Sequence, residues 1–215
     1  MLTKSKESIS GTLQAASSIA APPRPRIPLA RPQATSDDVL VARIAAGDRW
    51  AMEVLYARHH VRVFRFVLRL VQDEPTAEDI ATDVFLDVWR RADRFEGRSA
   101  VSTWILGIAR FKALSALRRR SLEPFDHDSA TAVEDPADTP ATALEKKDTS
   151  QIIRQCLTEL PVQHREIIDL AYYHEKSLEE VAEIVGIPKN TVKTRMFRAR
   201  SRLAGLLREA GIRRD

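Results

Sequence analysis

The segment from residue 177 to residue 203 constrains the fold more strongly than any other part of this 215-residue chain. Ser177 and Glu180 match a Ser-x-x-Glu capping box, which favours a helix start at this point. Gly186 is expected to end that short helix, because glycine tolerates a positive φ. Pro188 suits the first turn of the next helix, since its ring presets φ. A short helix, a glycine turn and a basic helix are typical of a helix-turn-helix motif.

The helix expected after Pro188 has an apolar side and a basic side. At about 100° per residue, the apolar side is formed by Val192, Met196, Ala199 and Leu203. Residues 187–208 contain seven Lys or Arg and no acid. A solvated cationic helix is the plain alternative, but the caps, the turn and the basic helix together favour binding to a DNA groove. The residues predicted to contact DNA are Lys189, Asn190, Thr191, Lys193, Thr194, Arg195, Phe197, Arg198, Arg200 and Arg202.

Helical periodicity also fills residues 36–120. Apolar residues recur there at spacings of three and four, which predicts helices over 37–46, 50–71, 75–92 and 100–120. No alternating β-branched run is bounded by turn signals, so no strand is expected. Helices are expected again from about residue 143, with a break at Pro161. The predicted fold is therefore all-α, with a four-helix N-terminal domain and a C-terminal helix-turn-helix domain.

Charge is distributed unevenly along the chain, although the net charge is only +4. Residues 1–35 carry five Lys or Arg and one acid and are rich in Ser, Ala and Pro, which predicts a disordered basic tail. A signal peptide is the competing interpretation, but the stretch lacks an apolar h-region. Residues 121–145 hold seven acids and no Lys or Arg, which predicts a flexible acidic linker. The two folded domains are thus expected at 36–120 and 146–215.

Composition excludes several functional classes. No run approaches the ~20 apolar residues of a membrane span, so no membrane insertion is expected. Cys156 is the only cysteine, which excludes an intramolecular disulfide and a Cys-cluster metal site and fits a cytoplasmic location. The glycines are too scattered for a phosphate-binding loop, and no cofactor is expected. A helical di-metal enzyme built on Asp79 and Asp83 is disfavoured, because no Glu has a His three residues later. We therefore do not expect an enzyme.

The helix predicted over 75–92 carries an acidic face. Asp79, Asp83 and Asp87 follow one another at four-residue spacing, and Glu78 lies alongside them. Like charges at this spacing destabilise an isolated helix by a few tenths of a kcal/mol per pair. A basic protein partner would convert this repulsion into attraction, whereas a merely solvated face is the alternative interpretation.

Aromatic and basic residues alternate in the helix predicted over 100–120 and in the loop before it. This combination suits single-stranded nucleic acid, because unstacked bases stack on rings and the backbone contacts cations. Core packing is the alternative, particularly for Trp104. The candidate residues are Phe95, Arg98, Trp104, Arg110, Phe111, Lys112, Arg118 and Arg119.

In this order, the segments resemble a bacterial RNA polymerase sigma factor of the small, two-domain extracytoplasmic-function (ECF) group. The resemblance covers about residues 36–120 and 145–210. It rests on residues 40–48, 77–80, 84–89 and 103–110 in the first domain, and on Leu160-Pro161, Arg165-Glu166, 191–195 and 198–200 in the second.

The resemblance implies a function for each segment. The helix over 78–89 would bind core RNA polymerase, the region over 95–120 would capture non-template bases of the minus-ten promoter element, and the basic helix would contact the minus-thirty-five element. The implied polymerase-binding residues are Glu78, Asp79, Asp83, Asp87 and Trp89. The family often pairs with an anti-sigma factor, which is therefore a further expected partner alongside core polymerase and promoter DNA.

Two points stay open at this level. The chain departs from the family pattern at Thr82, Phe111 and Ser115, so the resemblance does not define its minus-ten preference. The main rival function is a conventional helix-turn-helix regulator with an N-terminal sensing domain, which would bind duplex DNA specifically without polymerase.

Overall fold

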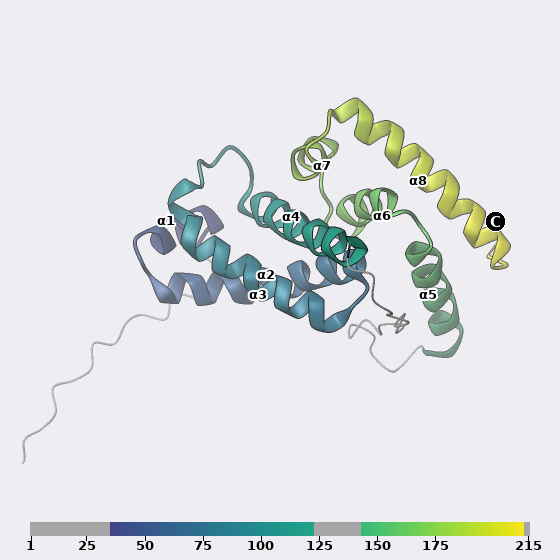
Figure 1. Ribbon diagram of the computed structural model, residues 1–215, viewed down its shortest axis with the longest axis horizontal. Helices are drawn as coiled ribbons and strands as arrows, with labels where there is room; N and C mark the ends of the chain where they lie inside the picture. Colours follow the sequence, from purple (N-terminus) through teal and green to yellow (C-terminus); the bar gives the residue numbers. More distant parts are fainter. Residues whose placement is uncertain (1–34, 123–142, 213–215) are drawn as a thin grey trace, which may run out of the picture. The chain divides into compact units, whose positions relative to one another are not determined.

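The described part of the chain is built from helices and contains no strand, which confirms the all-α prediction (Figure 1). This computed structural model describes residues 35–122 and 143–212. Residues 1–34 of the predicted tail and 123–142 of the predicted linker lie outside the described residues.

The first helical set, α1 to α4, corresponds to the predicted N-terminal domain. It comprises α1 (Asp37–Ala45), α2 (Arg49–Val71), α3 (Glu74–Arg91), a 3-10 turn (Ala92–Arg94) and α4 (Val101–Leu122). These bounds agree with the predicted helices to within two residues.

The second helical set, α5 to α8, contains the predicted helix-turn-helix. It comprises α5 (Ala143–Thr158), α6 (Val162–Ile168), a π-helical turn (Asp169–Tyr173), α7 (Leu178–Val185) and α8 (Lys189–Glu209). α5 ends shortly before Pro161, as predicted, because proline cannot donate the next helical hydrogen bond.

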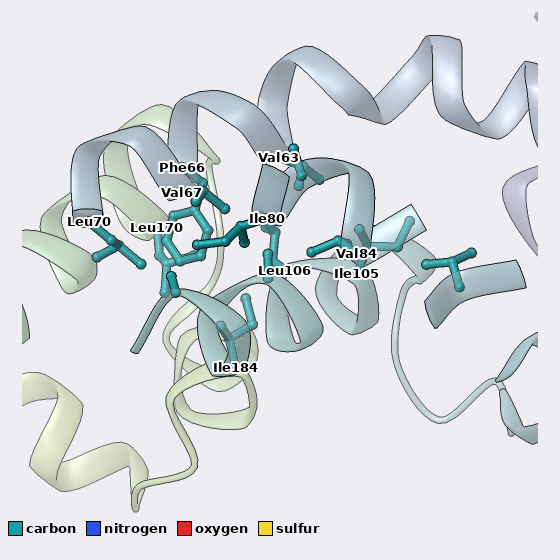
Figure 2. Close-up of a cluster of buried hydrophobic side chains, with 14 of the residues drawn as sticks. Val63, Phe66, Val67, Leu70, Ile80, Val84, Ile105, Leu106, Leu170 and Ile184 are labelled. Atoms are coloured by element: carbon teal, nitrogen blue, oxygen red, sulfur yellow. The ribbon is translucent and has the colours of Figure 1, made fainter. Parts of the chain in front are cut away.

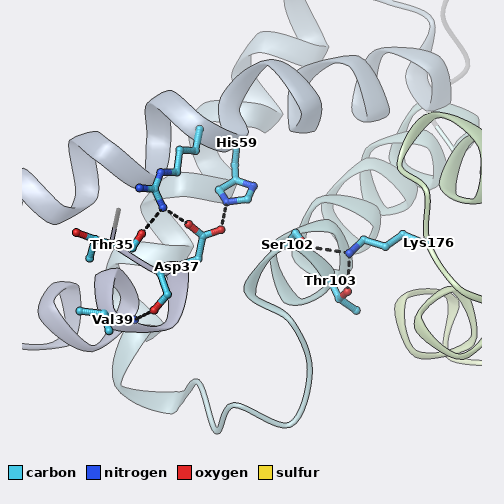
Figure 3. Close-up of polar contacts among 9 residues, drawn as sticks. Thr35, Asp37, Val39, His59, Ser102, Thr103 and Lys176 are labelled. Carbon is cyan, nitrogen blue, oxygen red and sulfur yellow. Dashed lines mark hydrogen bonds and ion pairs between the residues drawn. The ribbon is translucent and has the colours of Figure 1, made fainter. Parts of the chain in front are cut away.

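Short polar side chains define where the helices of the first set begin. Ser36, Asp48 and Asp73 precede α1, α2 and α3, and each side chain accepts a hydrogen bond from the N–H three residues later. These bonds satisfy backbone donors that have no partner within the helix, which stabilises each start by about 1 kcal/mol. Asp37, in the first turn of α1, also accepts hydrogen bonds from Arg58 at 2.6 Å and His59 at 2.7 Å, which tie α1 to α2 (Figure 3).

One cluster of buried apolar side chains joins helices of both sets (Figure 2). The cluster includes Phe66 and Val67 of α2, Leu106 of α4, Leu170 of the π-helical turn and Ile184 of α7. Each such side chain contributes about 1.5–3 kcal/mol on burial. The sequence predicts two separate domains and does not predict that they share a core.

Polar contacts surround this shared core. The Lys176 ammonium donates to Ser102 at 2.8 Å and to Thr103 at 2.9 Å (Figure 3). It also donates to Glu180 at 2.8 Å. The Thr103 hydroxyl in turn donates to Glu180 at 2.8 Å. Burial raises the pKa of Glu180, but the hydrogen bonds from Lys176 and the Ser177 N–H outweigh it, so the pKa falls from 4.5 to about 2. The folded chain therefore favours the charged form of Glu180.

This low pKa makes part of the stability pH-dependent. Because the folded pKa lies below the unfolded one, the contribution of Glu180 is present above about pH 4.5 and is lost as the pH falls towards about 2. We expect Glu180→Gln, which can still cap α7, to lower the free energy of unfolding by about 1–3 kcal/mol near neutral pH. The difference from the unsubstituted protein should shrink below about pH 4.5, as measured by urea unfolding across a pH series.

Glu183→Gln is the matched control, because Glu183 is an exposed carboxylate on α7 that pairs with no described residue. Its unfolding free energy should stay within about 0.5 kcal/mol of the unsubstituted value at every pH. A pH-independent effect of Glu180→Gln would contradict the assigned role of Glu180.

Candidate nucleic-acid and polymerase interfaces

The turn between α7 and α8 has the geometry that its sequence predicts. The Ser177 hydroxyl accepts from the Glu180 N–H at 3.2 Å, and the Glu180 carboxylate accepts from the Ser177 N–H at 3.0 Å, so the capping box is complete. Gly186 adopts a left-handed conformation with φ 70°, which would strain any residue with a Cβ. α8 then begins after Pro188, whose φ is −57°. These features set the direction in which α8 leaves α7.

α8 buries one side and exposes the other. Val192, Met196 and Ala199 are buried and Leu203 is half-buried, so the predicted apolar stripe is confirmed. On the opposite side, the phenyl ring of Phe197 is 74% exposed and lies among exposed cations. A large aromatic ring so exposed among cations has no packing role within the described residues. This surface therefore has the form of a binding face.

The predicted DNA-contact residues on α8 differ in whether they already have partners. Lys189 forms an ion pair with Glu179 of α7, and the Arg200 guanidinium lies 5.4 Å from the centre of the Tyr172 ring. In contrast, Lys193 and Arg198 form no ion pair with any described residue and are exposed. The other predicted contacts are exposed Asn190, Thr194 and Arg202 and half-buried Thr191 and Arg195.

The positive field of α8 extends to a neighbouring helix. Burial lowers the pKa of His164 in α6, and the charges of Arg202, Arg195 and Arg198 lower it further. A histidine whose protonation is disfavoured by three cations marks a site where an anion would be attracted.

The aromatic residues around α4 have two different environments. Phe95 and Trp104 pack against the apolar core, with ring centres 5.1 Å apart. Phe111 is 71% exposed on the surface of α4. Trp104 thus takes part in core packing, the alternative considered for it, while Phe111 offers an open ring face.

Two of the predicted cations on α4 are engaged within the chain. The Arg110 guanidinium donates to both carboxylate oxygens of Glu166, at 2.8 and 3.3 Å. Lys112 lies 3.2 Å from Asp87 and 3.6 Å from Asp83 of α3. The remaining predicted cations, Arg98, Arg118 and Arg119, are exposed, and Arg98 pairs with its neighbour Glu96.

The acidic face of α3 is directed to solvent. Glu78, Asp79 and Asp83 are exposed, whereas Asp87 is largely covered and pairs with Lys112, and Trp89 packs against the core. Leu86 lies on the same face and is 45% exposed. Leu86 is not among the residues predicted to be functional. Helical periodicity could have identified it, because that periodicity puts Leu86 on the side of Asp79 and Asp83 and not on the buried apolar side.

Buried charges in the second helical set were also not predicted as site residues. Arg165 donates to the carbonyl oxygens of Arg69 at 2.8 Å and of Leu160 at 3.1 Å, and Asp169 accepts from Arg69 at 2.6 Å. Glu166 and Asp169 are 1% and 2% exposed. Their signal in the sequence is the presence of acids inside the otherwise apolar run around Ile167 and Leu170.

Residues 35–122 and 143–212 contain no metal-binding cluster and no membrane-spanning helix. Within these ranges, no three His, Cys, Asp or Glu side chains lie together as a metal ion would require. No helix there is both long enough and apolar enough to cross a bilayer.

Two sigma-70 family profiles match the chain in the expected order. Sigma-70 region 2 matches residues 55–123, and sigma-70 region 4 matches residues 150–203. The first match ends with α4, and the second includes α6, α7 and most of α8.

Curated relatives align over nearly their whole length. The chain is 30% identical to the RNA polymerase sigma-H factor of Pseudomonas aeruginosa over 81% of this chain and 97% of that protein. It is 32% identical to the ECF RNA polymerase sigma factor SigM of Mycobacterium tuberculosis over 80% of this chain and 85% of that protein.

Solved structures share the fold. The sigma factor RpoE of Bartonella quintana, solved in complex with the anti-sigma factor NepR, matches with 30% identity and a TM-score of 0.58 over 71% of this chain and 94% of that chain. CnrH, solved with the cytosolic domain of CnrY, matches with a TM-score of 0.62 at 23% identity, over 81% of this chain and 99% of that chain. With an acidic helix, an aromatic and cationic helix and a basic helix-turn-helix in this order, the chain belongs to the ECF group of RNA polymerase sigma factors.

Proposed function

We propose that this sigma factor joins core RNA polymerase and directs promoter-specific initiation through two DNA contacts and one protein contact, each made by a different helix. The observation that carries the proposal is the open face of α8, where Lys193, Phe197 and Arg198 are exposed and no described acid pairs with the two cations. An unpaired cationic face of this kind is suited to the phosphates and base edges of a duplex.

α8 would bind the minus-thirty-five element in the major groove. Residues near its N-terminus, including Asn190, Lys193 and Thr194, would contact base edges, as the second helix of a helix-turn-helix does. Cations farther along, Arg198 and Arg202, would contact phosphates. Lys189 would first have to exchange its partner Glu179 for a phosphate.

α4 and the loop before it would bind the melted minus-ten strand. Phe111 supports this proposal, because its open ring face could stack on an unpaired base, which is worth about 1–3 kcal/mol. Arg118 and Arg119, exposed at the end of the helix, would hold the backbone of that strand.

α3 would bind core RNA polymerase. Its exposed acids favour a basic partner surface, and the exposed Leu86 adds an apolar contact in the middle of that face. A charged rim around an apolar contact is the usual composition of a protein interface.

The further assignments follow from membership of the family. We place the protein in the cytoplasm with polymerase, acting as an initiation factor and not as an enzyme. An anti-sigma factor is a proposed partner, supported by the complex of the similar RpoE with the anti-sigma factor NepR.

A sensing regulator remains the second candidate, and the small cavity between α2, α4 and the segment that joins the π-helical turn to α7 disfavours it. The cavity lined by His59, Arg62, Ser102 and Lys176 among others measures about 40 Å³. Sites for small organic ligands measure about 300–1,000 Å³. This cavity is therefore too small for an effector.

The assignment of α8 predicts a selective loss of promoter recognition. Lys193→Glu or Arg198→Glu should abolish promoter-specific transcripts, since each reversal costs at least about 1–3 kcal/mol of DNA binding, while affinity for core polymerase stays unchanged. Run-off transcription and core-binding titrations with purified protein measure the two effects.

Arg208→Glu is the control for this pair, because Arg208 is exposed on the last turn of the same helix and is not a predicted contact. Loss of core binding in Lys193→Glu would contradict the separation of the two functions. Specific footprints without polymerase, together with no transcript in its presence, would favour the sensing regulator.

The assignment of α3 predicts weaker binding to polymerase. Asp79→Lys combined with Asp83→Lys should reduce affinity for core polymerase at least about tenfold, or about 1.4 kcal/mol, by opposing a basic partner surface. Asp38→Lys combined with Glu53→Lys changes the net charge equally at exposed positions on α1 and α2 and should leave the affinity unchanged. Equal affinities for both double variants would refute the α3 assignment.

A further inference from the structure

We propose that Tyr172 is a further residue of the DNA interface, which positions the Arg200 guanidinium for a backbone phosphate. The inference rests on the proposed function of α8 and extends it to a side chain outside that helix. It follows from two neighbouring tyrosines that each lie beside an arginine, in arrangements that differ in what else the arginine contacts.

The two tyrosines are the last residues of the π-helical turn, and both are exposed. Tyr172 is 55% and Tyr173 49% exposed, so neither ring gains much from burial. The Arg69 guanidinium of α2 lies 4.0 Å from the centre of the Tyr173 ring. The Arg200 guanidinium of α8 lies 5.4 Å from the centre of the Tyr172 ring. Both distances allow a cation–π interaction, because the face of an aromatic ring attracts a cation within about 6 Å.

The two arginines differ in their remaining partners. Arg69 donates to the Asp169 carboxylate at 2.6 Å, and the Asp169 side chain is 3% exposed. The contact between Arg69 and Tyr173 therefore belongs to the packing of α2 on the π-helical turn. Arg200 is exposed and pairs with no carboxylate of the residues that the structure describes. The Tyr172 ring covers one face of its guanidinium, while the hydrogen-bond donors at the edge stay open to an anion.

The segment that carries the Tyr172 ring is anchored on both sides. Before the ring, Asp169 is 2% exposed and Leu170 is fully buried. After it, the Lys176 N–H donates to the Leu170 carbonyl oxygen at 3.0 Å, and Glu175 adopts a left-handed φ of 52°. A residue with a Cβ rarely adopts this conformation, which persists where the surrounding structure imposes it. The core therefore holds the backbone of Tyr172 in place.

Arg200 lies at one edge of the proposed DNA face. At about 100° per residue, it lies about 80° around the helix axis from the buried Val192. Arg202 lies about 80° from Val192 in the opposite direction. The two arginines thus flank the open face of α8, where the phosphates on the two sides of a major groove would lie. Among the described residues, Arg200 has an aromatic ring beside its guanidinium and Arg202 has none.

A guanidinium that is already positioned binds a phosphate more favourably than one that is free to move. Immobilising one long side chain on binding weakens the Kd by about two- to tenfold. The Tyr172 ring restricts Arg200 before DNA arrives, so less conformational freedom is lost on binding. Because the tyrosine is uncharged, we expect it to affect DNA binding through Arg200.

A double-mutant cycle in the purified full chain tests this role. Tyr172→Leu removes the ring at an exposed position, Tyr172→Phe keeps the ring, and Arg200→Ala removes the cation. Arg202→Ala is the matched background, and Tyr173→Leu removes the ring that belongs to the packing. The probe is a fluorescein-labelled duplex of mixed sequence, about 30 base pairs long, because phosphate contacts do not depend on sequence. Fluorescence anisotropy gives the Kd, and circular dichroism verifies the helical content of each variant.

Tyr172→Leu should raise the Kd by about two- to tenfold, and Tyr172→Phe should keep it within about twofold of the unsubstituted value. In the Arg200→Ala background, Tyr172→Leu should have no further effect, because the side chain that the ring positions is absent. In the Arg202→Ala background, it should keep its full effect. Tyr173→Leu should leave the Kd unchanged. A purely structural role for Tyr172 would not depend on which arginine is absent.

An unchanged Kd in Tyr172→Leu, or an equal loss in both arginine backgrounds, overturns the inference. The same holds if Tyr172→Phe or Tyr173→Leu loses as much affinity as Tyr172→Leu. If Arg200→Ala and Arg202→Ala each weaken duplex binding while Tyr172→Leu does not, α8 keeps its assignment and the inference fails alone. If neither arginine variant weakens duplex binding, the DNA assignment of α8 fails as well.

Discussion

The Glu166 carboxylate, buried to 1% exposure, is the charge around which the two helical sets are organised. A carboxylate at that depth is tolerable only when a cation and hydrogen bonds compensate its lost hydration. Arg110 supplies both from α4, so α6 packs where Arg110 can reach it. Arg110 therefore belongs both to the contact between the two helical sets and to the residues predicted to bind DNA.

The local structure could be predicted from the sequence because its signals are local. Ser36, Asp48 and Ser177 cap helices through hydrogen bonds to N–H groups three residues away, and Gly186 supplies the left-handed residue that the turn after α7 requires. The stripe on α8 was predictable for the same reason, since helical periodicity alone brings Val192, Met196 and Ala199 to one side.

The pairing of the two sets could not be predicted in this way. Arg69 and Asp169 are 100 residues apart, and Arg110 and Glu166 are 56 apart, so no spacing rule connects the members of either pair. Periodicity tells which face of α4 is apolar but not which helix covers it. For that reason Arg110 and Lys112 were assigned to DNA on composition, whereas the structure shows each of them beside a carboxylate.

The ion pair between Lys189 and Glu179 also bears on how the protein responds to ionic strength. Cations that neutralise DNA phosphates release condensed counterions, and each such contact steepens the fall of affinity with salt by close to one power of the salt concentration. Lys193 and Arg198, which have no acidic partner among the described residues, would contribute fully to that slope. Lys189 would exchange Glu179 for a phosphate and leave an unpaired carboxylate behind. Added salt weakens both the Lys189–Glu179 ion pair and the contact of Lys189 with a phosphate. Lys189 therefore makes duplex binding less sensitive to salt than the number of cations on α8 alone suggests.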